Sequence, residues 1–247
     1  MNKEWIEKCN HWKKKWPTIT DEHRQETHKG LNLYAVLDAI NRHSQSHHIL
    51  VGDAGSISYI GPVALEAKEN QRFIFSPAQA DMGWALPGAI GVSMASKQPV
   101  IAITGDGSFM SNLQELAVIK HHQLDIKVVI LNNAGYLSIR NTQKNYYQGR
   151  VYGTGTSNGL WFPDFVELAE AFKIKGVQIS KVEELNKFSE ILPNPGPMII
   201  DCVCLETQAI EPSQAIKDGK QAGPHNMAPF LSKEELEAEM IVDLPII

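Results

Sequence analysis

The chain has 247 residues, of which 43% are hydrophobic and 21% charged, a balance typical of globular proteins. Its formal net charge of −5 argues against nucleic acid or an anionic membrane surface as a partner. Because the sequence has only three cysteines, no signal peptide and no apolar run of the roughly 20 residues that a membrane-spanning helix needs, we expect a cytoplasmic protein without disulfide bonds.

The first predicted element is a helix within residues 1–28, which form an N-terminal helical arm. Its apolar residues recur every three or four positions, so they share one helix face. They are Trp5, Cys9, Trp12 and Trp16, and Pro17 ends the helix. We expect this face to pack on its own domain, on another domain or on another subunit.

Between residues 29 and 205, short apolar strands alternate with helices. The predicted strands lie within 47–55, 72–75, 99–107, 126–133, 175–179 and 197–205. The predicted helices cover 31–43, 83–96, 112–122, 165–172 and 182–192. This alternation indicates an α/β fold with a doubly wound, mainly parallel sheet and helices on both of its faces. Such a sheet binds its ligand at the carboxyl ends of the strands.

Residues 206–247 have a different character, because they are polar and contain many turn-forming residues. We expect a C-terminal tail or lid that ends in a helix at 232–242.

Two of the predicted strands end in residues that suit a metal ion. Asp106 lies between Gly105 and Gly107 after one strand, and Asn133 follows the next strand. Because these strand ends meet at one edge of the sheet, we expect the carboxylate and the carboxamide to lie close together. Both groups offer the hard oxygen ligands that Mg²⁺ or Ca²⁺ takes, and the glycines let the backbone approach a phosphate closely. The pattern predicts a diphosphate–metal site.

The segment "GDGSFMSNLQELAVIKHHQLDIKVVILNN", residues 105–133, resembles the signature of thiamine-diphosphate-dependent enzymes. Further support comes from "GDAGSISYIG" at 52–61, "MGWALPGAIG" at 82–91 and "PFLSKEELEAEMIV" at 229–242. The likeness covers roughly residues 31–242 and is strongest to the acetolactate synthase and 2-oxo-acid decarboxylase branch. It identifies 29–205 as similar to the carboxy-terminal, diphosphate-binding domain of such enzymes.

The resemblance implies that Mg²⁺ is held by the side chains of Asp106 and Asn133 and by the backbone carbonyl of Gly135. It implies cofactor contacts for a further set of residues: Ala54, Gly55, Ser56, Ala80, Met82, Gly105, Gly107, Ser108 and Tyr136. In the family pattern, Met82 would be the apolar wedge that bends thiamine diphosphate. The Ala80 carbonyl would face the 4′-amino group of the cofactor. Many relatives have glycine at that position.

The resemblance also implies that no certain catalytic residue lies in this chain. The glutamate that activates the cofactor belongs to a pyrimidine-binding domain, which we expect on a partner subunit of a split enzyme. The chain could also be a piece of a longer enzyme, and the partner could be a second copy of the chain. The expected substrate is pyruvate or another small 2-oxo acid, with decarboxylation and carboligation as in acetolactate synthase.

Two alternatives stay open at this stage. One is a subunit of a 2-oxo-acid decarboxylase that does not carry out carboligation. The other is a non-catalytic phosphate- or nucleotide-binding module, although the sequence contains neither the G-x-G-x-x-G pattern after its first strand nor a P-loop. Iron–sulfur oxidoreductases are excluded for this chain, since its three cysteines cannot provide four cluster ligands.

Overall fold

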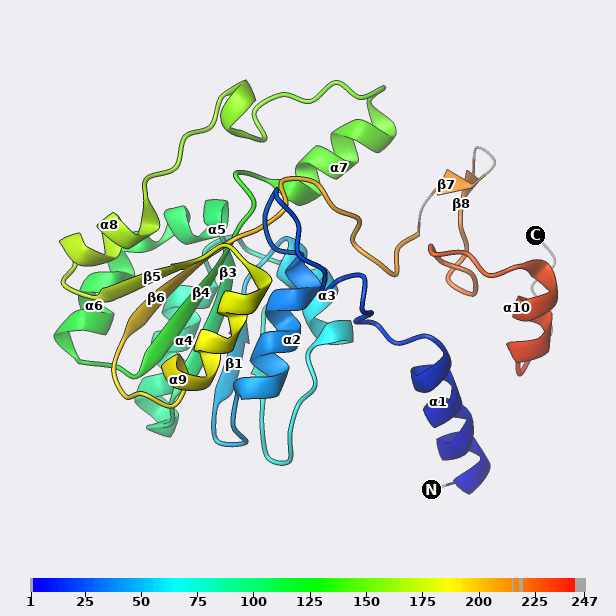
Figure 1. Ribbon diagram of the computed structural model, residues 1–247, viewed down its shortest axis with the longest axis horizontal. Helices are drawn as coiled ribbons and strands as arrows, with labels where there is room; N and C mark the ends of the chain where they lie inside the picture. Colours follow the sequence, from blue (N-terminus) through cyan, green and yellow to red (C-terminus); the bar gives the residue numbers. More distant parts are fainter. Residues whose placement is uncertain (1, 215, 218–219, 243–247) are drawn as a thin grey trace. The chain divides into compact units, whose positions relative to one another are not determined.

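The computed structural model describes residues 2–214, 216–217 and 220–242. The chain divides into two compact units, Met1–Gln208 and Ala209–Ile247. The larger unit contains the sheet and every residue that we predict for the site (Figure 1).

The larger unit is built on a six-stranded parallel sheet with the strand order β2-β1-β3-β4-β6-β5. The strands are β1 (Ile49–Gly52), β2 (Phe73–Ile74), β3 (Val100–Gly105), β4 (Ile126–Asn132), β5 (Lys175–Ile179) and β6 (Met198–Val203). All five strand pairings are parallel, so the predicted fold class is confirmed. The central strands are mostly apolar, with Lys127 and Thr104 as exceptions, because side chains on both faces of the sheet are buried.

Helices cover both faces of the sheet (Figure 1). On one face lie α4 (Ala85–Ser96), α6 (Leu116–His121) and α8 (Phe165–Ala171), which share a buried cluster with Val100, Ala102 and Val128. Because side chains alternate along a strand, the residues between these point to the other face. On that face, α2 (Leu33–His43) contacts α3 (Ser56–Ala64) and α9 (Phe188–Ile191).

The strand order positions the site. From β1 the chain crosses to β2 at one edge and then returns to β3 on the other side of β1. The direction of winding therefore changes between β1 and β3, and at such a point a crevice opens beyond the carboxyl ends of the strands. Three helices begin within a few residues of these ends: α3 after β1, α5 (Asp106–Ser111) after β3 and α7 (Leu137–Tyr146) after β4.

The structure corrects part of the predicted element list. The single helix predicted at 112–122 is wrong, because a short 3₁₀ turn at Leu113–Glu115 precedes the shorter helix α6. Helix α5 begins at Asp106, inside the predicted strand 99–107, and helices α3 and α7 were not predicted. Gly61 and Pro62 lie inside α3 and suggest a turn, while the sequence of α7 is mostly polar. Both helices carry residues that line the crevice.

Two more 3₁₀ helices of the larger unit cover Thr156–Asn158 and Val182–Lys187, the latter directly before α9. The arm and the smaller unit contain further elements. Helix α1 (Lys3–Lys15) ends before Pro17, as predicted, and none of its residues is buried in the described part of the chain. The smaller unit has the two-stranded antiparallel pair β7 (Ile216–Lys217) and β8 (Lys220–Gln221) and helix α10 (Lys233–Glu239). The end of the predicted tail, 243–247, lies outside the described residues. Among the helices described, none has the length and apolar character needed to cross a membrane.

Candidate functional site

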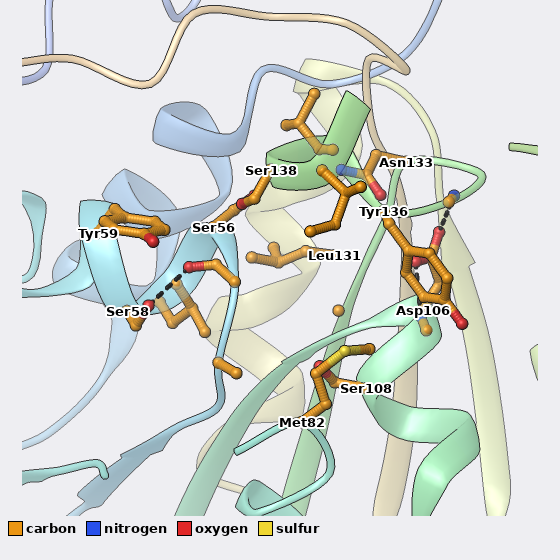
Figure 2. Close-up of a pocket in the computed structure, with 18 of the residues that line it drawn as sticks. Ser56, Ser58, Tyr59, Met82, Asp106, Ser108, Leu131, Asn133, Tyr136 and Ser138 are labelled. Carbon is orange, nitrogen blue, oxygen red and sulfur yellow. Dashed lines mark hydrogen bonds between the residues drawn. The ribbon is translucent and has the colours of Figure 1, made fainter. Parts of the chain in front are cut away.

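A pocket of about 270 Å³ lies at the carboxyl edge of the sheet. The loops that follow β1, β3 and β4 contribute its walls, together with the segment before α4. Figure 2 shows Asp106, Asn133 and Tyr136 gathered on one side of it and Ser56 and Tyr59 on the other. All the residues predicted for the site line this one pocket: Ala54, Gly55, Ser56, Ala80, Met82, Gly105, Asp106, Gly107, Ser108, Asn133, Gly135 and Tyr136.

Asp106 is the buried carboxylate of the pocket, with 1% of the residue exposed. Its Oδ1 accepts the N–H of Gly107 at 2.6 Å, and its Oδ2 accepts the N–H of Gly135 at 2.8 Å. Burial raises the pKa of Asp106 to about 6, although these N–H groups and the charge of Arg140 act in the opposite direction. A cation beside such a buried carboxylate would stabilise its charged form.

Asn133 completes a cluster of polar atoms around this carboxylate. One end of its side-chain amide lies 2.7 Å from the carbonyl oxygen of Gly135 and 3.3 Å from Oδ2 of Asp106. With its nitrogen at this end, the amide donates to both oxygens. With its oxygen there, a carboxylate, a carboxamide and a backbone carbonyl face one another. Three oxygen atoms at such distances repel unless a cation lies between them.

This donor set fits Mg²⁺. Magnesium takes oxygen ligands at roughly 2.0–2.1 Å in octahedral geometry, so neighbouring ligand atoms lie about 3 Å apart. The distances of 2.7 and 3.3 Å around Asn133 lie on either side of this value. No group of three or more His, Cys, Asp or Glu residues competes as a metal site within the described part of the chain.

The backbone around Gly135 requires glycine. Gly135 has a φ of 145°, and a Cβ atom at this position would overlap the carbonyl oxygen of Thr154. The N–H of Tyr136 donates to that same carbonyl at 2.9 Å. The loop therefore lies directly against the segment at Thr154, which leaves the Gly135 carbonyl on the side of Asn133.

Gly107 is constrained by a neighbour from the next loop. A Cβ atom on Gly107 would overlap the ring of Tyr136, so the ring packs flush against the backbone at the start of α5. From the sequence, Gly107 was expected to let the backbone approach a phosphate closely and to contact the cofactor. The structure adds that the same glycine makes room for Tyr136.

The N-terminus of α3 presents free donors to the pocket. Its cap residue, Gly55, has a φ of 69° and makes no side-chain capping bond. In the described structure, the backbone N–H groups of Ser56 and Ile57 have no protein acceptor. N–H groups at a helix N-terminus are suited to bind an anion such as a phosphate.

The segment before α4 contributes Ala80 and Met82 to the pocket wall. Figure 2 shows Met82 at this wall. Ala80 has a φ of 52°, in the left-handed region, where glycine would adopt the same backbone conformation at lower cost. Asp53 holds the segment in place by accepting the N–H groups of Gly83 at 2.9 Å and Ala85 at 3.2 Å.

Asp53 is not among the residues that the sequence predicts for the site. Its carboxylate also accepts the Ala54 N–H at 2.7 Å and the Thr104 hydroxyl at 2.9 Å, so it links the loop after β1 and the end of β3 to the Met82 segment. Burial raises its pKa. Its position directly after a strand, like that of Asp106, is the signal that could have revealed it.

Other pocket residues lie on the helices that sequence reasoning missed. Tyr59 comes from α3, and Ser138 and Ile139 come from α7. The Ser138 hydroxyl oxygen is buried and has no hydrogen-bond partner in the described part of the chain, which leaves it free for a ligand.

Comparison with known proteins shows which family the chain belongs to. The family described as "Thiamine pyrophosphate enzyme, C-terminal TPP binding domain" matches residues 53–202, which span the sheet from the end of β1 to β6 and contain the whole predicted site. The chain belongs to this family.

Similar members of the thiamine pyrophosphate enzymes include acetolactate synthase subunits. The large subunit from Cyanidium caldarium is 31% identical over 212 residues, 84% of this chain and 34% of that protein. Isozyme 2 from Escherichia coli (strain K12) is 29% identical over 206 residues, 81% of this chain and 37% of the relative. The chain thus spans about a third of the length of the curated relatives it matches.

A solved structure extends this comparison. The thiamine diphosphate-dependent 4-hydroxybenzoylformate decarboxylase of Rhodococcus jostii RHA1 matches with a TM-score of 0.64 and 25% identity, covering 72% of this chain and 33% of that one. The predicted relationship to the diphosphate-binding domain of thiamine-diphosphate-dependent enzymes is therefore confirmed.

Proposed function

We propose that the pocket binds thiamine diphosphate through Mg²⁺, which is held by Asp106, Asn133 and the carbonyl of Gly135. The observation that carries the proposal is the convergence of their polar atoms, with the Asn133 amide 2.7 Å from Gly135 and 3.3 Å from Asp106. One carboxylate and two neutral oxygens leave room for phosphate oxygens in the metal's coordination shell.

The remaining residues have supporting roles in this proposal. The free N–H groups of Ser56 and Ile57 bind the diphosphate, and Ser108 approaches it from α5. Met82 supports the cofactor from the side, and the Ala80 carbonyl faces its pyrimidine ring. The bound cofactor supplies an electron sink for carbanion chemistry.

We infer a reaction on a small 2-oxo acid. The acetolactate synthase relatives support decarboxylation followed by carboligation, with pyruvate as the leading candidate. The decarboxylase among the solved structures supports decarboxylation alone as the second candidate. Both candidates use the same metal and diphosphate site in this chain.

We also infer that a pyrimidine-binding domain on another chain, or on another part of a longer one, covers the pocket. Large apolar side chains at its walls are strongly exposed: Tyr59 at 62%, Ile139 at 51% and Met82 at 46%. Exposed apolar surface around a polar centre is typical of an interaction site. The volume of about 270 Å³ lies below the roughly 300–1,000 Å³ of complete ligand pockets.

Calorimetry with thiamine diphosphate tests the cofactor proposal. Binding should require Mg²⁺, and Asp106→Ala should weaken it by at least about 100-fold, because the metal loses its charged ligand. Asp81→Ala is the matched control, since Asp81 is an exposed carboxylate beside Met82 that does not line the pocket. Equal loss in both variants, or tight metal-free binding of NAD or ATP by the wild type, would contradict the proposal and favour a nucleotide-binding module.

A further inference from the structure

Arg140 is a buried cation beside the proposed metal site. It lies on α7, and only 5% of the residue is exposed. Its guanidinium donates to three backbone carbonyls: those of Thr154 at 2.9 Å, Ala134 at 3.3 Å and Glu206. Within the described residues it forms no salt bridge with a carboxylate. Burying a guanidinium without a carboxylate partner costs folding free energy, which suggests that its contacts with the three carbonyls serve a function.

The contact with Ala134 fixes one particular peptide group. In a trans peptide the C=O and the following N–H point in opposite directions. The carbonyl of Ala134 accepts from Arg140, and the N–H of Gly135 in the same peptide donates to Oδ2 of Asp106 at 2.8 Å. This peptide plane is therefore held from both ends.

The contact with Thr154 fixes the next peptide group. The carbonyl of Thr154 accepts one hydrogen bond from Arg140 and one from the N–H of Tyr136, at 2.9 Å in each case. The N–H of Tyr136 belongs to the same peptide as the carbonyl of Gly135. Because the N–H points toward Thr154, the Gly135 carbonyl points the opposite way, toward Asn133.

There is little room for this arrangement to relax. A Cβ atom on Gly135 would lie 2.7 Å from Nη2 of Arg140, and one on Gly155 would lie 2.9 Å from the same nitrogen. Gly135 and Gly155 also form an antiparallel β-bridge. The guanidinium thus fills the space between the loop after β4 and the loop at Thr154.

We propose that Arg140 is a positioning residue that holds the backbone after β4 so that the Gly135 carbonyl faces the metal. The inference rests on the proposed function, since it concerns the same Mg²⁺ site. A carbonyl already turned toward the metal does not have to be ordered when the ion binds, so the affinity for Mg²⁺ is higher.

The chain offers a matched control for the cost of losing a buried cation. Lys127, at the beginning of β4, is 2% exposed and contacts Asp125 and the carbonyl of Gly196, the latter at 2.7 Å. The proposed metal site lies beyond the opposite end of the same strand. Removing either cation should lower stability, but only Arg140 touches the metal-binding loop.

The test is a titration of Mg²⁺ into protein with a fixed concentration of thiamine diphosphate, followed by calorimetry. Arg140→Gln should raise the Mg²⁺ concentration at half-saturation by about 10- to 100-fold, the usual effect of losing a residue that orients a metal ligand. Arg140→Lys should raise it less, because an ammonium still donates to one or two of the carbonyls. Lys127→Gln should lower the melting temperature and leave the Mg²⁺ midpoint unchanged.

The outcomes separate the two proposals. If the wild type binds and Arg140→Gln keeps its Mg²⁺ midpoint while its melting temperature falls, Arg140 is only structural and the inference is overturned. A shift of equal size in Lys127→Gln would overturn it as well, because general destabilisation would then explain the effect. If the wild type itself shows no Mg²⁺-dependent binding, the proposed function fails and the inference falls with it. If Arg140→Gln does not fold, the Mg²⁺ midpoint of Arg140→Lys is compared with that of the wild type. A higher midpoint supports the inference, and an unchanged midpoint overturns it.

Discussion

Asp106 should make the protein less stable at neutral pH when no metal is bound. Its pKa in the folded protein is about 6, against 3.8 for a solvated carboxyl, because the group is buried. The folded state therefore holds a proton that the unfolded chain releases above pH 4. Stability should fall as the pH rises from about 4 to about 6 and then level off.

The size of the effect follows from the two pKa values. The difference between 3.8 and about 6 corresponds to about 3 kcal/mol at neutral pH, of which about 2 kcal/mol develops between pH 4 and pH 7.5. Asp106→Asn removes the titrating group but also replaces one acceptor of a backbone N–H by an NH₂ group. That loss is the same at every pH, so it cancels when the two pH values are compared.

The assay is urea unfolding of the wild type and Asp106→Asn at pH 4 and pH 7.5, without Mg²⁺ and without thiamine diphosphate. Every other titrating group contributes equally to both proteins. The stability of Asp106→Asn relative to the wild type should increase by about 2 kcal/mol from pH 4 to pH 7.5. A difference that does not change with pH would refute the argument that burial raises this pKa.

The remaining predictions concern the same loops. Below pH 6 the apparent affinity for Mg²⁺ in the presence of thiamine diphosphate should fall by up to about tenfold per pH unit, because a proton competes with the metal for Asp106. Calorimetry over this pH range, corrected for the titration of the cofactor itself, measures the affinity. An affinity that does not change with pH would contradict the prediction. Gly135→Ala should cost about 3 kcal/mol of stability, since its Cβ overlaps a neighbouring carbonyl, whereas Gly149→Ala, with a φ of 73° and open space around it, should cost only about 1 kcal/mol. If denaturant unfolding gives equal losses of stability for Gly135→Ala and Gly149→Ala, the positive φ alone explains the cost and the overlap with the neighbouring carbonyl adds nothing. Gly107→Ala should cost about 2 kcal/mol in the wild type and much less in a Tyr136→Ser background, and an additive double-mutant cycle would exclude the contact between them.

The sequence by itself determined the fold class and predicted that Asp106 and Asn133 of the candidate site lie together. Strands that are buried on both faces are mostly apolar, so β3 and β4 can be recognised locally. Their carboxyl ends meet at one edge of any parallel sheet, which is why Asp106 and Asn133 could be paired without a structure. Gly135, two residues after Asn133, also carries a local signal, because residues other than glycine rarely adopt its φ of 145°.

Only the tertiary structure decided which residues hold these loops in place. Asp53 accepts hydrogen bonds from residues 83, 85 and 104, and Arg140 joins the backbone at residues 134, 154 and 206. Neither set has a fixed spacing, because the partners meet only after the sheet has formed. The helices α3 and α7 escaped prediction for a related reason. Packing on the sheet stabilises α3 despite Gly61 and Pro62, and local propensity carries no information about that packing.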